Sequence, residues 1–234
     1  YADEPFYFTH GIASGDPLAD RVILWTRLIP GNGQHAEIDC QWQVAKDAEF
    51  KQLVSSGSAS TSAARDYTIK VDAGGLAPGS QYYYRFLRGS ISSPVGTTRT
   101  LPEGDISEFR LGVCSCSNYP QGYFNTYRHM ANTDLDLVLH LGDYIYEYGR
   151  GGYDGGAKFA ARIFPADEIL TLADYRLRYA SYRSDKQLQA LHANFPMIAS
   201  TDDHESANDS WEGGAQNHSV DEGDWNSRRN AAMQ

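Results

Sequence analysis

The hydrophobic pattern of this 234-residue chain changes near residue 102. Up to that point, apolar and polar residues alternate in short runs separated by Gly, Pro, Asn and Ser. Alternation with a period of two residues is typical of strands that bury one face. Since no helical pattern separates these runs, we expect residues 1–103 to fold as a β-sandwich domain.

The runs predict individual strands and the residues that share a face. We expect strands at residues 21–28, 36–44, 66–71 and 81–88. In the last run, Tyr82, Tyr84 and Phe86 share one face because side chains two residues apart in a strand point the same way. Trp25 and Trp42 are expected in the core of the sandwich, which would be of the fibronectin or immunoglobulin kind.

The second half of the chain combines strands with helices. A short apolar run at 109–113 is followed by a helical period over 122–130 and a nearly continuous apolar run at 135–141. This order is typical of two parallel strands joined by a crossover helix. We therefore expect a second domain over residues 104–234, and the predicted fold class is α/β with an N-terminal sandwich.

Another helix and another strand are predicted further along. Thr171 precedes a helical pattern and Asp174 follows three residues later, which is the spacing of a capping box. The helical segment ends before Phe195 and Pro196, and residues 196–200 form the next predicted buried strand. Each predicted parallel strand leads into a polar segment at its carboxyl end.

The charge balance excludes several kinds of partner. Twenty Lys and Arg against thirty Asp and Glu leave a formal net charge of −10. A nucleic-acid-binding surface needs an excess of basic side chains, so we expect none here. No run approaches the roughly 18 apolar residues that a membrane helix requires, so no membrane span is expected. Three Cys are too few for a disulfide scaffold.

Side chains that can bind metal ions follow all three predicted parallel strands. They lie in residues 114–118, 142–147 and 201–205. The carboxyl ends of parallel strands meet at one edge of a sheet, where ligands of open α/β sheets bind. Carboxylate, thiolate and phenolate groups gathered there repel one another unless cations lie among them. The sequence therefore predicts a metal site at this edge.

Six spaced segments carry a resemblance to a known family. They are THGIASGDP at 9–17, VILWTR at 22–27, FRLGVCSC at 109–116, GYF at 122–124, HLGDYIYE at 140–147 and DDHE at 202–205. In this order they resemble the PhoD-type alkaline phosphatase family of the metallophosphatase superfamily. Because that superfamily draws further ligands from motifs later in the chain, we expect this sequence to be an N-terminal portion with an incomplete metallophosphatase domain.

The resemblance implies two cofactors, Fe³⁺ and Ca²⁺, and their ligands. Cys116 and Tyr146 would hold the iron, and Asp143 would bridge the two metals. Asp203 would bind on the calcium side. A thiolate and a phenolate suit a highly charged transition ion, whereas carboxylates suit calcium.

The resemblance also implies a reaction, which is hydrolysis of phosphate monoesters or diesters by in-line attack of metal-bound hydroxide. Asp143 and His204 are the expected catalytic residues, and His204 would assist the leaving group or stabilise transition-state charge. His204 and Asn208 would contact the small phosphate-ester substrate. A secreted or periplasmic location is implied, and the oligomeric state stays open.

Other interpretations stay open on the sequence alone. Asp143 could be a loop carboxylate that caps local amides, Tyr146 is one of sixteen tyrosines, and Cys116 could be a small apolar residue. A phospholipase D-like phosphodiesterase could use the same site. A third possibility is a non-catalytic module whose sandwich binds a cell-surface glycan.

Overall fold

The computed structural model describes residues 6–31, 37–153 and 158–234. The chain divides into two compact units. The first unit comprises residues 1–112, 126–138 and 186–198, and the second comprises residues 113–125, 139–185 and 199–234. These units do not test the predicted boundary between two domains at residue 103, which stays a prediction.

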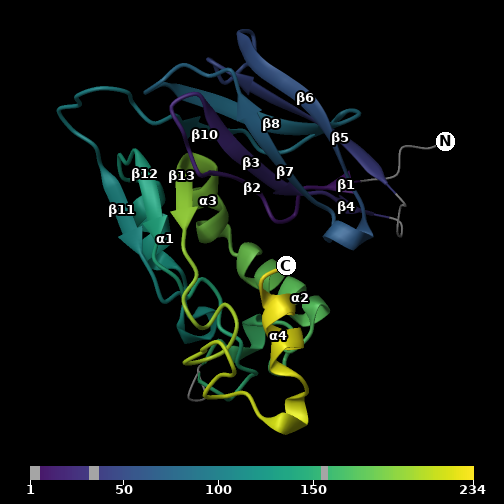
Figure 1. The fold of residues 1–234 in the computed structure, drawn as a ribbon. Coiled ribbons are helices and arrows are strands. Elements are labelled where there is room, and N and C mark those ends of the chain that lie inside the picture. The colour runs from purple at the N-terminus through teal and green to yellow at the C-terminus, as the bar shows by residue number, and fades with distance from the viewer. Residues whose placement is uncertain (1–5, 32–36, 154–157) are drawn as a thin grey trace. The chain divides into compact units, whose positions relative to one another are not determined.

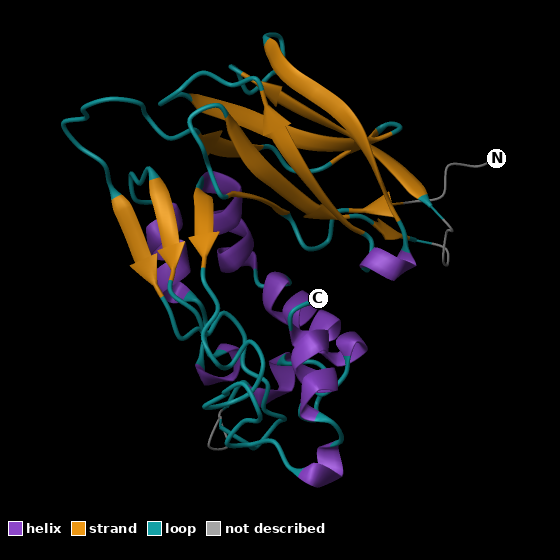
Figure 2. Ribbon diagram, in the orientation of Figure 1, coloured by secondary structure: helices purple, strands orange, loops and turns teal. Residues whose placement is uncertain are grey.

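Two sheets account for most strands of the chain (Figures 1 and 2). One sheet has the order β10 (Gly96–Arg99), β8 (Gln81–Arg88), β5 (Ile38–Ala45) and β6 (Leu53–Thr61), with β9 (Ile91–Ser92) paired to β8. The other has the order β11 (Leu111–Cys114), β12 (Leu137–His140), β13 (Pro196–Ala199), β2 (Ile12–Gly15), β3 (Arg21–Arg27) and β7 (Thr68–Gly74). Strands β1 (Phe6–Tyr7) and β4 (Ile29–Pro30) pair separately.

The core of the first unit is one apolar cluster with members from both sheets. Tyr82, Tyr84 and Phe86 of β8 are at most 1% exposed and belong to it, so the predicted shared face is confirmed as the buried one. Burying each such side chain contributes on the order of 2 kcal/mol. The two sheets therefore pack face to face as a sandwich, while its fibronectin or immunoglobulin class stays a prediction.

Of the two tryptophans predicted in the core, one packs against this cluster and the other does not. Trp42 is partly buried against the cluster. Trp25 is not among the residues of the cluster, so its placement in the core was wrong. The reason is the register of β3, because Val22 and Leu24 take the inward positions and Trp25 has the opposite parity.

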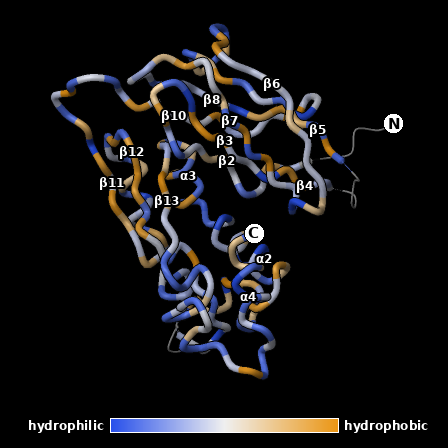
Figure 3. The backbone as a smooth tube through the Cα atoms, viewed as in Figure 1, coloured by the Kyte–Doolittle hydropathy of each residue, from blue (hydrophilic) through white to orange (hydrophobic). Residues whose placement is uncertain are grey.

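The parallel unit is present as predicted. Strands β11, β12 and β13 point the same way (Figure 2), and α1 (Asn125–Ala131) connects β11 to β12. Helix α2 (Leu172–Arg183) begins after Thr171, whose side chain forms the predicted capping box with Asp174. Figure 3 shows that the segments following the three strands are largely hydrophilic.

The single helical segment predicted before Pro196 is in fact two helices. Helix α2 ends at Arg183, and α3 (Lys186–Asn194) starts after Ser184 and Asp185. Asp is favoured just before a helix rather than within it, because its carboxylate competes for backbone N–H groups. Helix α4 (Trp225–Ala232) likewise begins after an Asp, Asp224, which accepts from the Ser227 backbone N–H.

Two further observations complete the fold. Short 3-10 helices lie at Ala63–Arg65, Tyr119–Gln121, Ala160–Arg162 and Val220–Glu222. None of the helices in the described residues combines the length and hydrophobicity needed to span a bilayer.

Strand β13 extends the sheet of the sandwich, which the sequence pattern did not predict. It pairs in parallel with β2, with Pro196 opposite Ser14 and Met197 opposite Gly15. A Cβ at Gly15 would lie 2.5 Å from the carbonyl oxygen of Met197, so glycine is needed for this close approach. The β-strand that leads to residues 200–205 is therefore anchored on a strand near the N-terminus.

Candidate metal centre

The segments that follow β11, β12 and β13 are tied together by hydrogen bonds within the second unit. The backbone N–H of Cys116 donates to the Gly142 carbonyl at 3.2 Å, and that of Ser117 donates to the Asp143 carbonyl at 2.8 Å. The buried Glu205 carboxylate accepts from the backbone N–H groups of Asp202, at 2.7 Å, and of Tyr144. The three strand ends therefore meet, as predicted from parallel topology.

The backbone at these strand ends is locally strained. Cys116 and Asp143 have φ values of 58° and 54°, in the left-handed region that side chains other than Gly rarely adopt. Gly142 has a φ of +106°, and a Cβ there would lie 2.5 Å from the Asp202 Cβ. Strain of this kind persists only when surrounding contacts impose it, and it is common at functional sites.

Three of the predicted site residues form a compact group of ligand atoms. Asp143, Asp203 and His204 each offer one metal-binding atom, and these atoms lie within 4.8 Å of one another. Asp143 and His204 are only 7% and 6% exposed. The grouping places two carboxylates and an imidazole around one point, which is a donor set used for transition and alkaline-earth ions.

The hydrogen bonding of Asp143 fits a bound cation. Its Oδ2 accepts from the Tyr146 hydroxyl at 3.1 Å, whereas its buried Oδ1 has no hydrogen-bond partner among the residues that the structure describes. A buried carboxylate oxygen without a donor is energetically costly, and a cation at that oxygen removes the cost. The residues present therefore fit a metal ion.

Tyr146 is 6% exposed and lies beside the group. Burial raises the pKa of its phenol, and the negative charges of Asp143 and Cys116 raise that pKa further. A cation among these groups would reverse the direction, because positive charge favours the phenolate. The phenol is thus in a position where a metal would decide its protonation state.

Two other predicted site residues, Cys116 and Asn208, do not belong to the group of three ligand atoms. Cys116 is exposed, acts electrostatically on Tyr146, and its Sγ is not part of the 4.8 Å group. The side chain of Asn208 donates to Gln216 at 2.8 Å. Their assigned roles as iron ligand and substrate contact therefore stay predictions.

Sequence reasoning assigned no role to Glu147, which contacts His204 directly. Glu147 is 0% exposed, and its Oε2 lies 2.8 Å from His204 Nδ1. Burial lowers the pKa of His204, but the bond to Glu147 and the charges of Glu147, Asp143 and Asp203 outweigh it and raise that pKa overall. The sequence did contain a signal for Glu147, which lies in a run of aromatic and apolar residues. An acid in such a run is buried only when it has a hydrogen-bonding or ionic partner.

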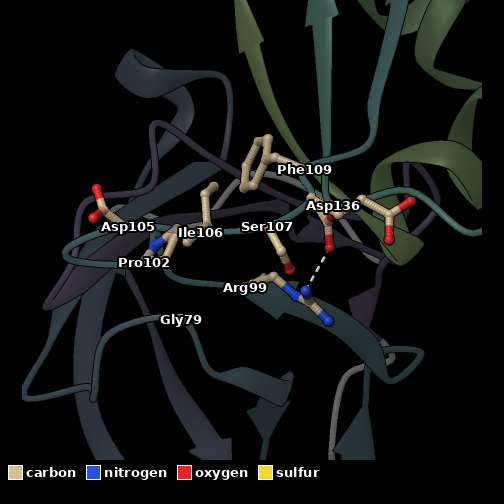
Figure 4. Close-up of a pocket in the computed structure, with 9 residues that line it drawn as sticks. Gly79, Arg99, Pro102, Asp105, Ile106, Ser107, Phe109 and Asp136 are labelled. Atoms are coloured by element: carbon tan, nitrogen blue, oxygen red, sulfur yellow. Dashed lines mark hydrogen bonds and ion pairs between the residues drawn. The ribbon is translucent and has the colours of Figure 1, made fainter.

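The first unit contains a pocket, shown in Figure 4, that is separate from the group of ligand atoms. The cavity has a volume of about 330 Å³ and is lined by Gly79, Arg99, Pro102, Asp105, Ile106, Ser107, Glu108, Phe109 and Asp136. Arg99 is paired with Asp136, whose other oxygen accepts from the Arg110 backbone N–H at 2.7 Å. Both oxygens of the buried carboxylate are thus used structurally, and no lining residue belongs to the ligand group.

Comparisons with known proteins point to one family. A model described as PhoD-like phosphatase matches residues 111–234, and a model of the PhoD-like phosphatase N-terminal domain matches residues 2–102. Alkaline phosphatase D from Bacillus subtilis (strain 168) is 46% identical over 208 residues, covering 86% of this chain and 36% of that protein. A solved "Structure of PhoD" is 42% identical with a TM-score of 0.89, covering 99% of this chain and 45% of that one. The chain thus spans less than half the length of these relatives.

Proposed function

Because this chain belongs to the PhoD-like phosphatase family, we propose that Asp143, Asp203 and His204 form part of a metal-dependent site that hydrolyses phosphate esters. The observation that carries the proposal is the buried Oδ1 of Asp143, which has no hydrogen-bond partner within the described part of the chain, in a residue that shares a group of three ligand atoms with Asp203 and His204. A phosphate dianion would be repelled by a chain of net charge −10, so cations are needed at the site.

The proposed cofactors are Fe³⁺ and Ca²⁺. Cys116 and Tyr146 would hold iron, Asp143 would bridge, and Asp203 would hold calcium; the contact of Tyr146 with Asp143 supports this assignment. When bound, such ions lower the pKa of coordinated water and so supply hydroxide at the working pH.

The protein's own side chains have separate roles in the proposed reaction. The strained backbone at Asp143 holds the negative charge of its carboxylate in a fixed position. His204 would exchange a proton with the leaving group or stabilise transition-state charge, because its ring lies beside Asp143 and Asp203. Asn208 would contact the ester, and its backbone N–H, which donates to Glu147 at 2.8 Å, keeps it near His204.

The finer points of the proposal come from the family resemblance. Both monoesters and diesters are proposed substrates, and a secreted or periplasmic location is proposed. Residues 1–103 are proposed to form the N-terminal sandwich domain and residues 104–234 part of the metallophosphatase domain. The ranges of the two family models, 2–102 and 111–234, support this division.

A direct experiment separates the proposed activity from its alternatives. The complete protein, with the later ligand motifs that the family resemblance implies, would be loaded with iron and calcium, analysed for both elements, and assayed with a chromogenic phosphate monoester and the corresponding diester. We expect turnover that calcium chelation abolishes and that Asp143→Asn removes together with metal. Turnover of the diester alone would indicate the phospholipase D-like alternative, and full turnover by Asp143→Asn would reject the assigned site.

A further inference from the structure

The bond between Glu147 and His204 fixes more than the position of the ring. We propose that Glu147 selects the tautomer of His204, holding the neutral imidazole with its proton on Nδ1 so that Nε2 is the nitrogen that takes up a second proton and passes it to the leaving group of the ester. This inference rests on the proposed function for the use of Nε2, but its central claim concerns a proton on a ring and can be tested without turnover.

The two oxygens of Glu147 have different partners. Oε2 contacts His204 Nδ1 at 2.8 Å. Oε1 accepts from the Asn208 backbone N–H at 2.8 Å and from Asn217 Nδ2 at 2.7 Å. A backbone N–H can only donate, so Oε1 has to be an acceptor. The orientation of the carboxylate is thus set by groups other than the histidine.

The tautomer follows from this arrangement. An ionised carboxylate only accepts hydrogen bonds, so Nδ1 has to carry the proton that it shares with Oε2. A neutral imidazole has one N–H, which leaves Nε2 with its lone pair. A buried carboxylate orients the imidazole of serine-protease triads in the same way, and the wrong tautomer there costs most of the rate.

Glu147 is itself held by a chain of partly buried hydrogen bonds. Asn217 Nδ2 also donates to Glu168 Oε1 at 3.2 Å, and Glu168 Oε1 accepts from Arg228 Nη2 at 2.8 Å. Arg228 belongs to α4 and is only 2% exposed. Because Asn217 is fixed on both sides, it cannot easily turn away from Glu147. Glu147 is therefore a positioning residue for His204.

Glu147→Gln makes a sharp prediction. Glutamine has one side-chain acceptor oxygen. The Asn208 N–H and Asn217 Nδ2 both donate to the position of Oε1, so the glutamine oxygen has to lie there. The glutamine NH₂ then faces His204 Nδ1, which can bond to it only by accepting. We expect the neutral ring to move its proton to Nε2. Ring ¹⁵N shifts measured at alkaline pH, and assigned by the signals lost in His204→Asn, distinguish the two tautomers.

Glu168→Gln is the matched control. Both contacts of Glu168 given above are made by Oε1, so a glutamine can present its oxygen to Asn217 and Arg228 without disturbing Glu147. We expect His204 to keep its proton on Nδ1 in this variant. A tautomer change as large as that of Glu147→Gln would show that the loss of any nearby carboxylate produces the effect, and it would overturn the proposal.

The tautomer of His204 in the unmodified chain tests the proposal without any variant. A proton on Nε2 of His204 in that chain would overturn the proposal, even if Glu147→Gln did not fold. A folded Glu147→Gln protein, judged by its thermal melting, that retained the proton on Nδ1 would do the same.

Kinetics separate this inference from the proposed function. Glu147 does not belong to the ligand group, so Glu147→Gln should lower kcat by on the order of 10²–10⁴-fold and leave KM nearly unchanged. Absence of turnover in every form of the complete protein would reject the function while the ring ¹⁵N shifts still decided the tautomer. Turnover that was unaffected by a confirmed tautomer change would reject the catalytic use of Nε2.

Discussion

The hydroxyl of Tyr146 donates a hydrogen bond to Asp143 Oδ2 at 3.1 Å, so two residues proposed as ligands of one metal are hydrogen-bonded to each other. The phenol is protonated in this arrangement, and burial raises its pKa. Binding of iron by the phenolate therefore has to release that proton.

Proton release on iron binding is the first prediction. Calorimetric titration in buffers of different ionisation enthalpy should detect proton release, and Tyr146→Phe should release about one proton fewer. Affinity for iron should increase with pH in the parent chain. Tyr148→Phe is the control, since Tyr148 also lies near His204 but was not assigned as a ligand. Equal proton release by Tyr146→Phe and the parent chain would contradict a phenolate ligand.

The second prediction concerns the bridging carboxylate. Asp143→Asn removes the charge of a buried ligand and should lower metal affinity by at least about 100-fold. Retained metal can be measured by elemental analysis after treatment with a chelator. Asp202→Asn provides the comparison, because Asp202 is exposed and does not belong to the ligand group. Similar metal retention by the two variants would mean that Asp143 does not bind metal.

The third prediction concerns the close approach at Gly142. Gly142→Ala places a methyl group 2.5 Å from the Asp202 Cβ and 2.7 Å from its backbone nitrogen, in addition to the unfavourable φ. Gly223→Ala has a similar φ of +99°, but no atom of the described residues lies within 4 Å of the new Cβ. Backbone strain alone costs about 1–3 kcal/mol, so Gly142→Ala should lose clearly more stability than Gly223→Ala in thermal unfolding. Equal losses would show that the approach of the two segments relaxes easily.

The fourth prediction is a pH dependence of stability. Burial lowers the pKa of His140 to about 4, whereas an unfolded histidine titrates near 6.5. The neutral ring therefore favours the folded state above about pH 6.5, and this contribution is lost as the pH falls through about 4. The full loss corresponds to about 3 kcal/mol.

His140→Gln should remove that part of the pH dependence. Glutamine does not titrate and can still bond to Ser117, which contacts His140 Nε2 at 3.0 Å. Urea unfolding at several pH values measures the slope. His129→Gln, at an exposed position, should keep the slope of the parent chain. A parent chain equally stable at pH values near 7 and 4 would contradict the prediction.

The local elements were predictable because their signals are local. The alternation through Tyr82, Tyr84 and Phe86 identified the face of β8, and the spacing of Thr171 and Asp174 located the start of α2. The convergence of Asp143, Asp203 and His204 followed from a general property of parallel sheets and from the family resemblance.

What the sequence did not predict depends on contacts between distant residues. The pairing of β13 with β2 joins residues about 180 positions apart, and no periodicity encodes it. Trp25 lies outside the core cluster because it has the opposite parity in β3 from the buried Val22 and Leu24. Glu147 had no assigned role because its partners, Asn208, Asn217 and His204, lie 57 to 70 residues further along the chain.

The parallel pairing of β13 with β2 limits how evolution and protein engineering can recombine this molecule. A polypeptide begun at residue 104 would lack β2 and would leave the backbone N–H and C=O groups of β13 on an open edge, which promotes self-association. Exchange of the sandwich for an unrelated module would break the same backbone hydrogen bonds. The N-terminal segment and the strand before Asp203 are therefore expected to be inherited together.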